Sequence, residues 1–102
     1  MFMVELSKTV VAEINILDYY DTPKGTRFRH EDGFIIEDSD DIQDLLERAD
    51  RLLLPNREVE VVFYDEESEW AYTPYRVSKD GTKHISGTCE EIAQIVNSQI
   101  GC

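Results

Sequence analysis

Residues 38–53 read Asp-Ser-Asp-Asp-Ile-Gln-Asp-Leu-Leu-Glu-Arg-Ala-Asp-Arg-Leu-Leu, and this stretch decides the fold. Its apolar residues recur at the spacing of one helix face, namely Ile42, Leu45, Leu46, Ala49, Leu52 and Leu53. Asp38 or Ser39 can cap the amino end, where the helix dipole also favours the acids that follow. Because Pro55-Asn56 ends the pattern, the sequence predicts one amphipathic helix in the middle of the chain.

Three strands are predicted before this helix. Val10–Leu17 alternates apolar and polar residues, which is typical of a strand with one buried face. Thr26–His30 and Phe34–Ile36 are the next two strands. We interpret Glu31-Asp32-Gly33 between them as a turn, because Asp-Gly tolerates positive φ.

Further strands follow the helix. Glu58–Tyr64 has the clearest alternation, and Glu69–Tyr72 returns beside it. Pro74 lacks an N–H and is therefore expected to break this strand or confine it to a sheet edge. Tyr75–Ser78 and Thr82–Ser86 form a second hairpin.

The chain then closes with a second helix. Thr88 and Glu91 have the spacing of a capping box, which opens a helix with Ile92, Ile95 and Val96 facing inward. The predicted order is three strands, a helix, three strands and a helix. We therefore expect a single compact α+β domain over residues 1–102, with a mostly antiparallel sheet of about five to six strands and two helices packed on one face.

Charge is distributed unevenly along this chain. Residues 31–69 contain 15 Asp and Glu against three Arg, so this third of the sequence holds the whole formal charge of −12. The acidic balance argues against direct contact with nucleic acid or anionic lipid, because phosphate groups are bound by Lys and Arg. It favours a basic protein surface as the partner.

Two acidic clusters are candidates for binding that partner. A rigid array of carboxylates can imitate nucleic-acid phosphates and steer association with a basic groove. Aromatic residues beside charges are typical of interface hot spots. The candidate residues are Glu37, Asp38, Asp40, Asp41, Asp44 and Glu47 in the first cluster, Asp65, Glu66, Glu67 and Glu69 in the second, and Trp70 and Tyr72 beside it. The alternative is that the acids form a solvated helix face and that Trp70 lines the core.

No motif predicts catalysis or a cofactor. His30 and His84 lack a histidine partner at helical spacing, and Asp38–Asp41 lacks the Gly and Glu of a calcium loop, so we expect no metal site. Cys89 stands at the predicted start of the second helix, where the dipole lowers a thiol pKa, and His84 lies five residues before it. No oxyanion loop accompanies this pair, and the sequence predicts a protein that is not an enzyme.

Our hypothesis is a small acidic inhibitor of a basic nucleic-acid-binding protein such as a nuclease, acting by nucleic-acid mimicry. Small size and acidity are the general character of phage or mobile-element inhibitors of host defence, anti-CRISPR proteins included. An immunity protein or antitoxin that neutralises a basic toxin is the alternative, as is a homodimer or assembly module using an exposed strand such as Tyr72–Val77. With two cysteines, no apolar run of membrane length and no signal-peptide core, we expect a cytoplasmic protein.

Overall fold

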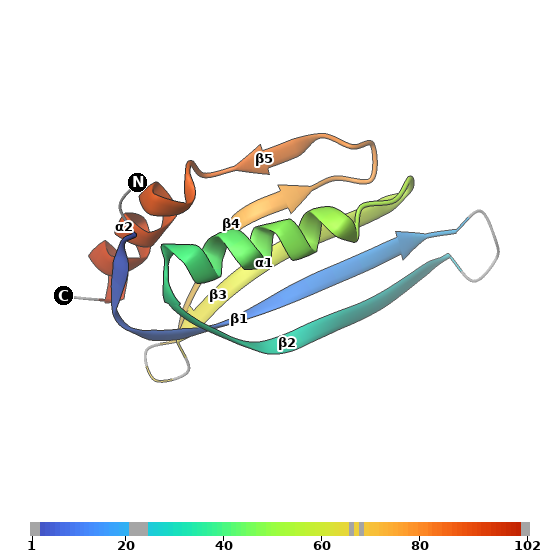
Figure 1. The fold of residues 1–102 in the computed structure, drawn as a ribbon. Coiled ribbons are helices and arrows are strands. Elements are labelled where there is room, and N and C mark those ends of the chain that lie inside the picture. Colours follow the sequence, from blue (N-terminus) through green and yellow to red (C-terminus); the bar gives the residue numbers. More distant parts are fainter. Residues whose placement is uncertain (1–2, 21–24, 66, 68, 101–102) are drawn as a thin grey trace.

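The fold is an α+β sandwich of one sheet and two helices, as the sequence predicts. The structure, a computed structural model, describes residues 3–20, 25–65, 67 and 69–100. Within them the strands form one antiparallel sheet in the order β2-β1-β3-β4-β5 (Figure 1). The elements are β1 (Glu5–Tyr19), β2 (Thr26–Asp38), α1 (Ser39–Arg51), β3 (Arg57–Asp65), β4 (Trp70–Val77), β5 (Lys83–Ile85) and α2 (Cys89–Ile100).

The predicted turn at Glu31-Asp32-Gly33 is wrong, because the two strands around it are one continuous strand, β2. The register shows the reason. Ala12 pairs with Phe34 and Ile14 pairs with Glu31, so between these two pairs β2 contains one residue more than β1. This is a β-bulge, and Gly33 occupies it with φ of 79°. Gly33 therefore has the positive φ expected of a turn residue, but it lies inside a strand.

Pro74 likewise lies within a continuous strand, β4, and does not break it. The strand runs unbroken from Trp70 to Val77, with β3 along one side and β5 along the other side from Tyr75 to Val77. A second register shift, between the Val61–Tyr75 and Phe63–Tyr72 pairs, places Pro74 in a bulge, where a residue without an N–H is tolerated. β5 pairs with Tyr75–Val77, so this part of the expected dimer edge at Tyr72–Val77 is already paired within the chain.

The core lies between α1 and one face of the sheet. Asp38 caps α1 by accepting a hydrogen bond from the Asp41 N–H at 3.0 Å. Leu52 and Leu53 fall beyond Arg51, where the helix ends, and are only partly buried. The predicted apolar faces are otherwise confirmed, and the buried residues are Ile42, Leu45, Leu46 and Ala49 of α1, Val10, Ala12, Ile14 and Ile16 of β1, and Val59, Val61 and Phe63 of β3.

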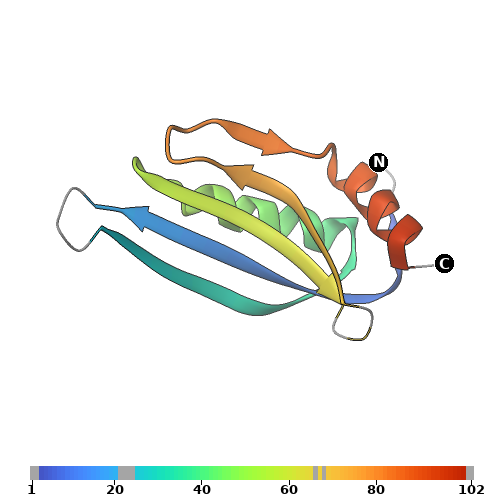
Figure 2. The same cartoon turned by 180° about the vertical axis from the view of Figure 1, so that it is seen from behind.

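The second helix, α2, completes the core at one end of the sheet. The predicted capping box is present, since Thr88 Oγ1 accepts from the Glu91 N–H at 3.1 Å and Glu91 accepts from the Thr88 N–H at 3.2 Å. Asn97 bonds the backbone of Glu5 and Ser7, which fixes α2 beside the first residues of β1. Seen from behind, the opposite sheet face has no helix over it (Figure 2). Neither helix of the described chain has the length and apolar character needed to cross a bilayer.

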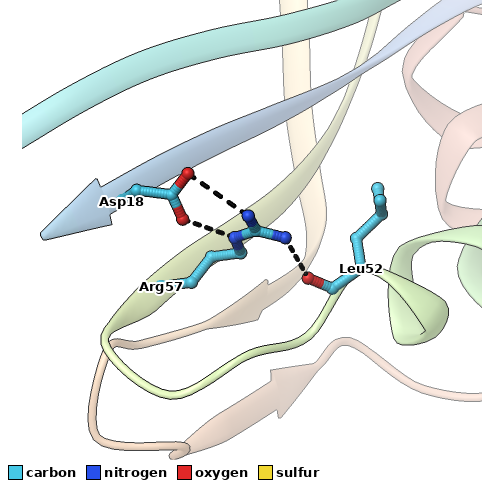
Figure 3. Close-up of polar contacts among 3 residues, drawn as sticks. All are labelled: Asp18, Leu52 and Arg57. Atoms are coloured by element: carbon cyan, nitrogen blue, oxygen red, sulfur yellow. Dashed lines mark hydrogen bonds and ion pairs between the residues drawn. The ribbon is translucent and has the colours of Figure 1, made fainter.

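A buried ion pair closes the other end of the molecule. Arg57 of β3 donates to both carboxylate oxygens of Asp18 in β1, at 2.5 and 3.2 Å, and to the Leu52 carbonyl at 2.8 Å (Figure 3). The bond to Leu52 satisfies a carbonyl at the C-terminal end of α1, where cations are also favoured by the dipole. One guanidinium thus ties together two strands and the helix.

Candidate partner-binding surface

The two acidic clusters lie at the same end of the molecule. Both views place the start of α1 and the end of β3 at this end (Figures 1 and 2). Lys8 and Thr9 of β1 line one surface hollow with Glu37 and Asp38, and a neighbouring hollow with Asp65 and Glu67. The clusters therefore flank the first residues of β1. Asp41 and Asp44 line a separate hollow beside Phe34 and Arg48. We call this end of the molecule, with Glu37, Asp38, Asp40, Asp41, Asp44, Asp65, Glu67 and Glu69, the acidic end.

Strand order is the cause of this convergence. Because β1 lies between β2 and β3, the end of β2 and the end of β3 both lie beside the start of β1. The helix α1 starts directly after β2, so its first turn is held there too. Segments more than 20 residues apart in sequence are brought together by topology alone.

The first cluster divides into residues that build the helix and residues that face water. Asp38 caps α1, and Asp41 accepts a hydrogen bond from the Glu37 N–H at 2.9 Å. The side chains of Glu37, Asp40 and Asp44 are exposed. Two of these five residues therefore have a structural role at the start of α1, and the other three present exposed carboxylates, which both a solvated face and a binding surface would have.

Glu47 lies farther along α1 and interacts with residues outside the first cluster. It accepts a hydrogen bond from Gln43 at 3.2 Å and, with Glu90 of α2, acts on the Cys89 thiol. Arg48, one turn after Asp44 on α1, forms an ion pair with Glu31 of β2 at 2.8 Å. Glu47 thus belongs to the contact of α1 with α2, beside the acidic end.

The second cluster is organised by Lys8. Its ammonium forms an ion pair with Asp65 at 2.5 Å, and this hydrogen bond raises the pKa of Lys8 despite partial desolvation. Asp65 also accepts from the Glu67 N–H at 3.1 Å. Glu67 and Glu69 are exposed, and Glu69 holds a φ of 55°. Glu66 lies outside the described residues. Sequence patterns had not singled out Lys8, since nothing in its own stretch indicates a contact with the β3 end.

The aromatic candidates pack toward the core. Trp70 and Tyr72 are partly buried, with ring centroids 6.1 Å apart, and Tyr72 meets Phe63 edge-on at 6.4 Å. The Tyr72 hydroxyl is buried and has no hydrogen-bond partner among the described residues. Tyr75 is fully buried and donates to Asp50 at 2.6 Å, and burial followed by this carboxylate raises the pKa of Tyr75. Trp70 is the aromatic residue that borders the acidic end in the sequence and retains some exposure.

Cys89 differs from the sequence expectation. Burial, followed by the charges of Glu90 and Glu47, raises the pKa of its thiol. Desolvation and like charge therefore outweigh the helix dipole. Among the residues that the structure describes, no three His, Cys, Asp or Glu side chains gather as metal ligands.

Comparison with known proteins gives no further assignment: no family model, no curated sequence and no solved structure matches this chain. The acidic end is the surface feature on which a functional argument can rest.

Proposed function

We propose that this chain is a small cytoplasmic binding protein that inhibits a basic nucleic-acid-binding protein by presenting carboxylates in place of phosphates. The observation that carries the proposal is the convergence of two acidic clusters, remote in sequence, on the acidic end. Phage or mobile-element inhibitors of host nucleases, of the anti-CRISPR type, are the class we infer. The acidic end provides the charge that such a mechanism requires.

Geometry supports binding through this surface. Glu37 lies at the end of β2, and Asp40 and Asp44 lie in the first turns of α1, which packs on the sheet, so these exposed carboxylates are positioned before a partner arrives. Glu67 and Glu69 add exposed charge between the end of β3 and the start of β4. Arg side chains bind carboxylates and phosphates with the same bidentate geometry. A groove built to hold a phosphate backbone can therefore hold this surface.

Electrostatics supports rapid capture of such a partner. A surface of one sign raises association rates with an oppositely charged groove by about 10–10³, and added salt removes most of this gain. Lys8 pairs with Asp65 and also attracts Glu67, and no ion pair within the described part of the chain involves the exposed acids of either cluster. Binding should therefore be fast and salt-sensitive.

The test is a comparison of three proteins as bait in a nuclease-treated lysate. These are the wild type, the variant D44N/E67Q/E69Q, which removes one exposed charge from α1 and two from the β3–β4 connection, and the control E13Q/D32N/E58Q. The control removes the same charge from positions outside the acidic end. We expect the wild type and the control to retain one basic protein that the acidic-end variant loses.

The captured protein then decides between the candidate functions. Release by added duplex DNA or RNA supports mimicry. Capture that nucleic acid cannot displace supports an immunity protein or antitoxin instead. Equal loss of the target by both variants, or no basic protein at all, would show that the acidic end is only a solvated face.

A further inference from the structure

The outer edge of β2 carries features that an isolated monomer does not need. It is a 13-residue edge strand, and Thr26–His30 are all exposed. Phe28 and Ile35 are 60% and 54% exposed. A long edge with apolar side chains is a template for pairing with another strand.

Charge along β2 is arranged in two halves. The first residues of β2 include Arg27, Arg29 and His30, and its last residues are Glu37 and Asp38. Between them, Glu31 binds Arg48 and Asp32 lies 3.7 Å from His30. Arg27 and Arg29 help to lower the pKa of Asp18, but among the described residues neither has a carboxylate within ion-pair distance. An antiparallel copy of the same strand brings these arginines opposite the acidic end of β2, whereas a parallel copy would place like charges side by side.

The bulge at Gly33 fixes which register fits. Before the bulge, Arg27 and Arg29 face the α1 side of the sheet, whereas Phe28 and His30 face the open side. After the bulge, Ile36 faces the α1 side and Ile35 faces the open side. Residues paired across antiparallel strands share a face. A register that pairs His30 of one copy with Ile35 of the other, and Arg27 with Asp38, satisfies this rule. In this register the bulges of the two copies meet at the twofold axis.

We propose that two copies of this chain pair antiparallel through β2, joining their sheets into one of ten strands. The interface is isologous, so each contact occurs twice. Phe28 and Ile35 of both copies cover each other on the open face, and Arg27 and Arg29 of each copy approach Asp38 of its partner. Both α1 layers then lie on the same side of the joined sheet. The argument for this assembly does not rest on the proposed inhibitor function, although Glu37 and Asp38 belong to both surfaces.

The first test is the mass of the full chain against concentration, by sedimentation, for the wild type, I35K and L54K. Leu54 is 57% exposed in the connection after α1, so L54K is a matched control for adding a charge at an exposed apolar site. We expect a reversible dimer whose dissociation constant rises at least about tenfold in I35K and stays unchanged in L54K. A monomer at about 1 mM, or equal effects of both variants, would overturn the proposal.

The second test reports the register. In a C89S/C102S background, H30C and I35C chains are mixed and oxidised. We expect a disulfide-linked dimer from the mixture, because paired residues have Cβ atoms about 5 Å apart. Neither variant should link to itself, since residue 30 would lie about 17 Å from its own copy. Self-linking at the level of the mixture would refute this pairing.

Discussion

Replacement of Asp18 by Asn should remove the interaction that holds the far end of the molecule. The side chains of Asp18 and Arg57 are only 12% and 11% exposed, and Arg57 makes two of its three bonds to this carboxylate. Asn preserves the shape but not the charge. Arg57 then remains largely buried and keeps hydrogen bonds to Leu52 and to the one amide oxygen of the new side chain, but no carboxylate balances its charge.

The expected cost is about 3 kcal/mol, the lower end of the range for breaking a buried pair, because a tenth of each side chain stays in water. A domain of this size has about 5–15 kcal/mol of stability, so the loss is a large share. With a urea m value of about 1.5 kcal/mol/M, the unfolding midpoint should fall by about 2 M. D32N, at an exposed acid, is the control.

The pH dependence gives this prediction a definite sign. Arg57 lowers the pKa of Asp18 below its ordinary 3.8 in the folded protein. Its stabilisation is therefore complete above pH 3.8 and is lost as the pH falls through the folded-state pKa. The difference between wild type and D18N should shrink in that acid range. A cost under about 1 kcal/mol at neutral pH, or one that persists at low pH, would refute the reasoning.

Three further outcomes can be checked by denaturation or labelling. Y72F should stabilise the fold by about 1 kcal/mol, because the buried hydroxyl has no partner among the described residues; a destabilised Y72F would show that the hydroxyl is satisfied. T88A should cost about 1 kcal/mol through loss of the α2 cap, and an unchanged midpoint would contradict this. In the C102S variant, Cys89 should react with iodoacetamide at pH 8 more slowly in the folded protein than in the unfolded protein, because folding raises the pKa of its thiol. Equal rates in the two states would contradict this prediction.

Periodicity was sufficient to predict the elements that bury one clear face. The stripe of α1 and the alternation of β1 and β3 are produced by side-chain hydrophobicity alone, and their inward residues are the buried ones. The capping residues Asp38 and Thr88 were likewise predictable because a cap satisfies backbone groups within its own turn.

The predicted turn at Gly33 and the predicted break or sheet edge at Pro74 share one physical cause. Gly33 and Pro74 have local preferences that suit a turn or break as well as a bulge. The choice is made by the neighbouring strands, since the 15-residue β1 pairs with both halves of β2 and β3 pairs with both halves of β4. Such long-range pairing leaves no trace in the local sequence, and neither does the meeting of Lys8 with Asp65.

The acidic end also predicts an opposition between stability and binding. Asp38, Asp41 and Asp65 have structural partners, whereas Asp44, Glu67 and Glu69 are exposed and are crowded by like charge. We therefore expect D44N/E67Q/E69Q to unfold at an equal or higher urea midpoint at low salt, with any gain disappearing as salt screens the repulsion. The same variant should lose the basic partner. A fold destabilised by these changes would mean that the exposed acids serve the structure, and the argument for a binding surface would fail with it.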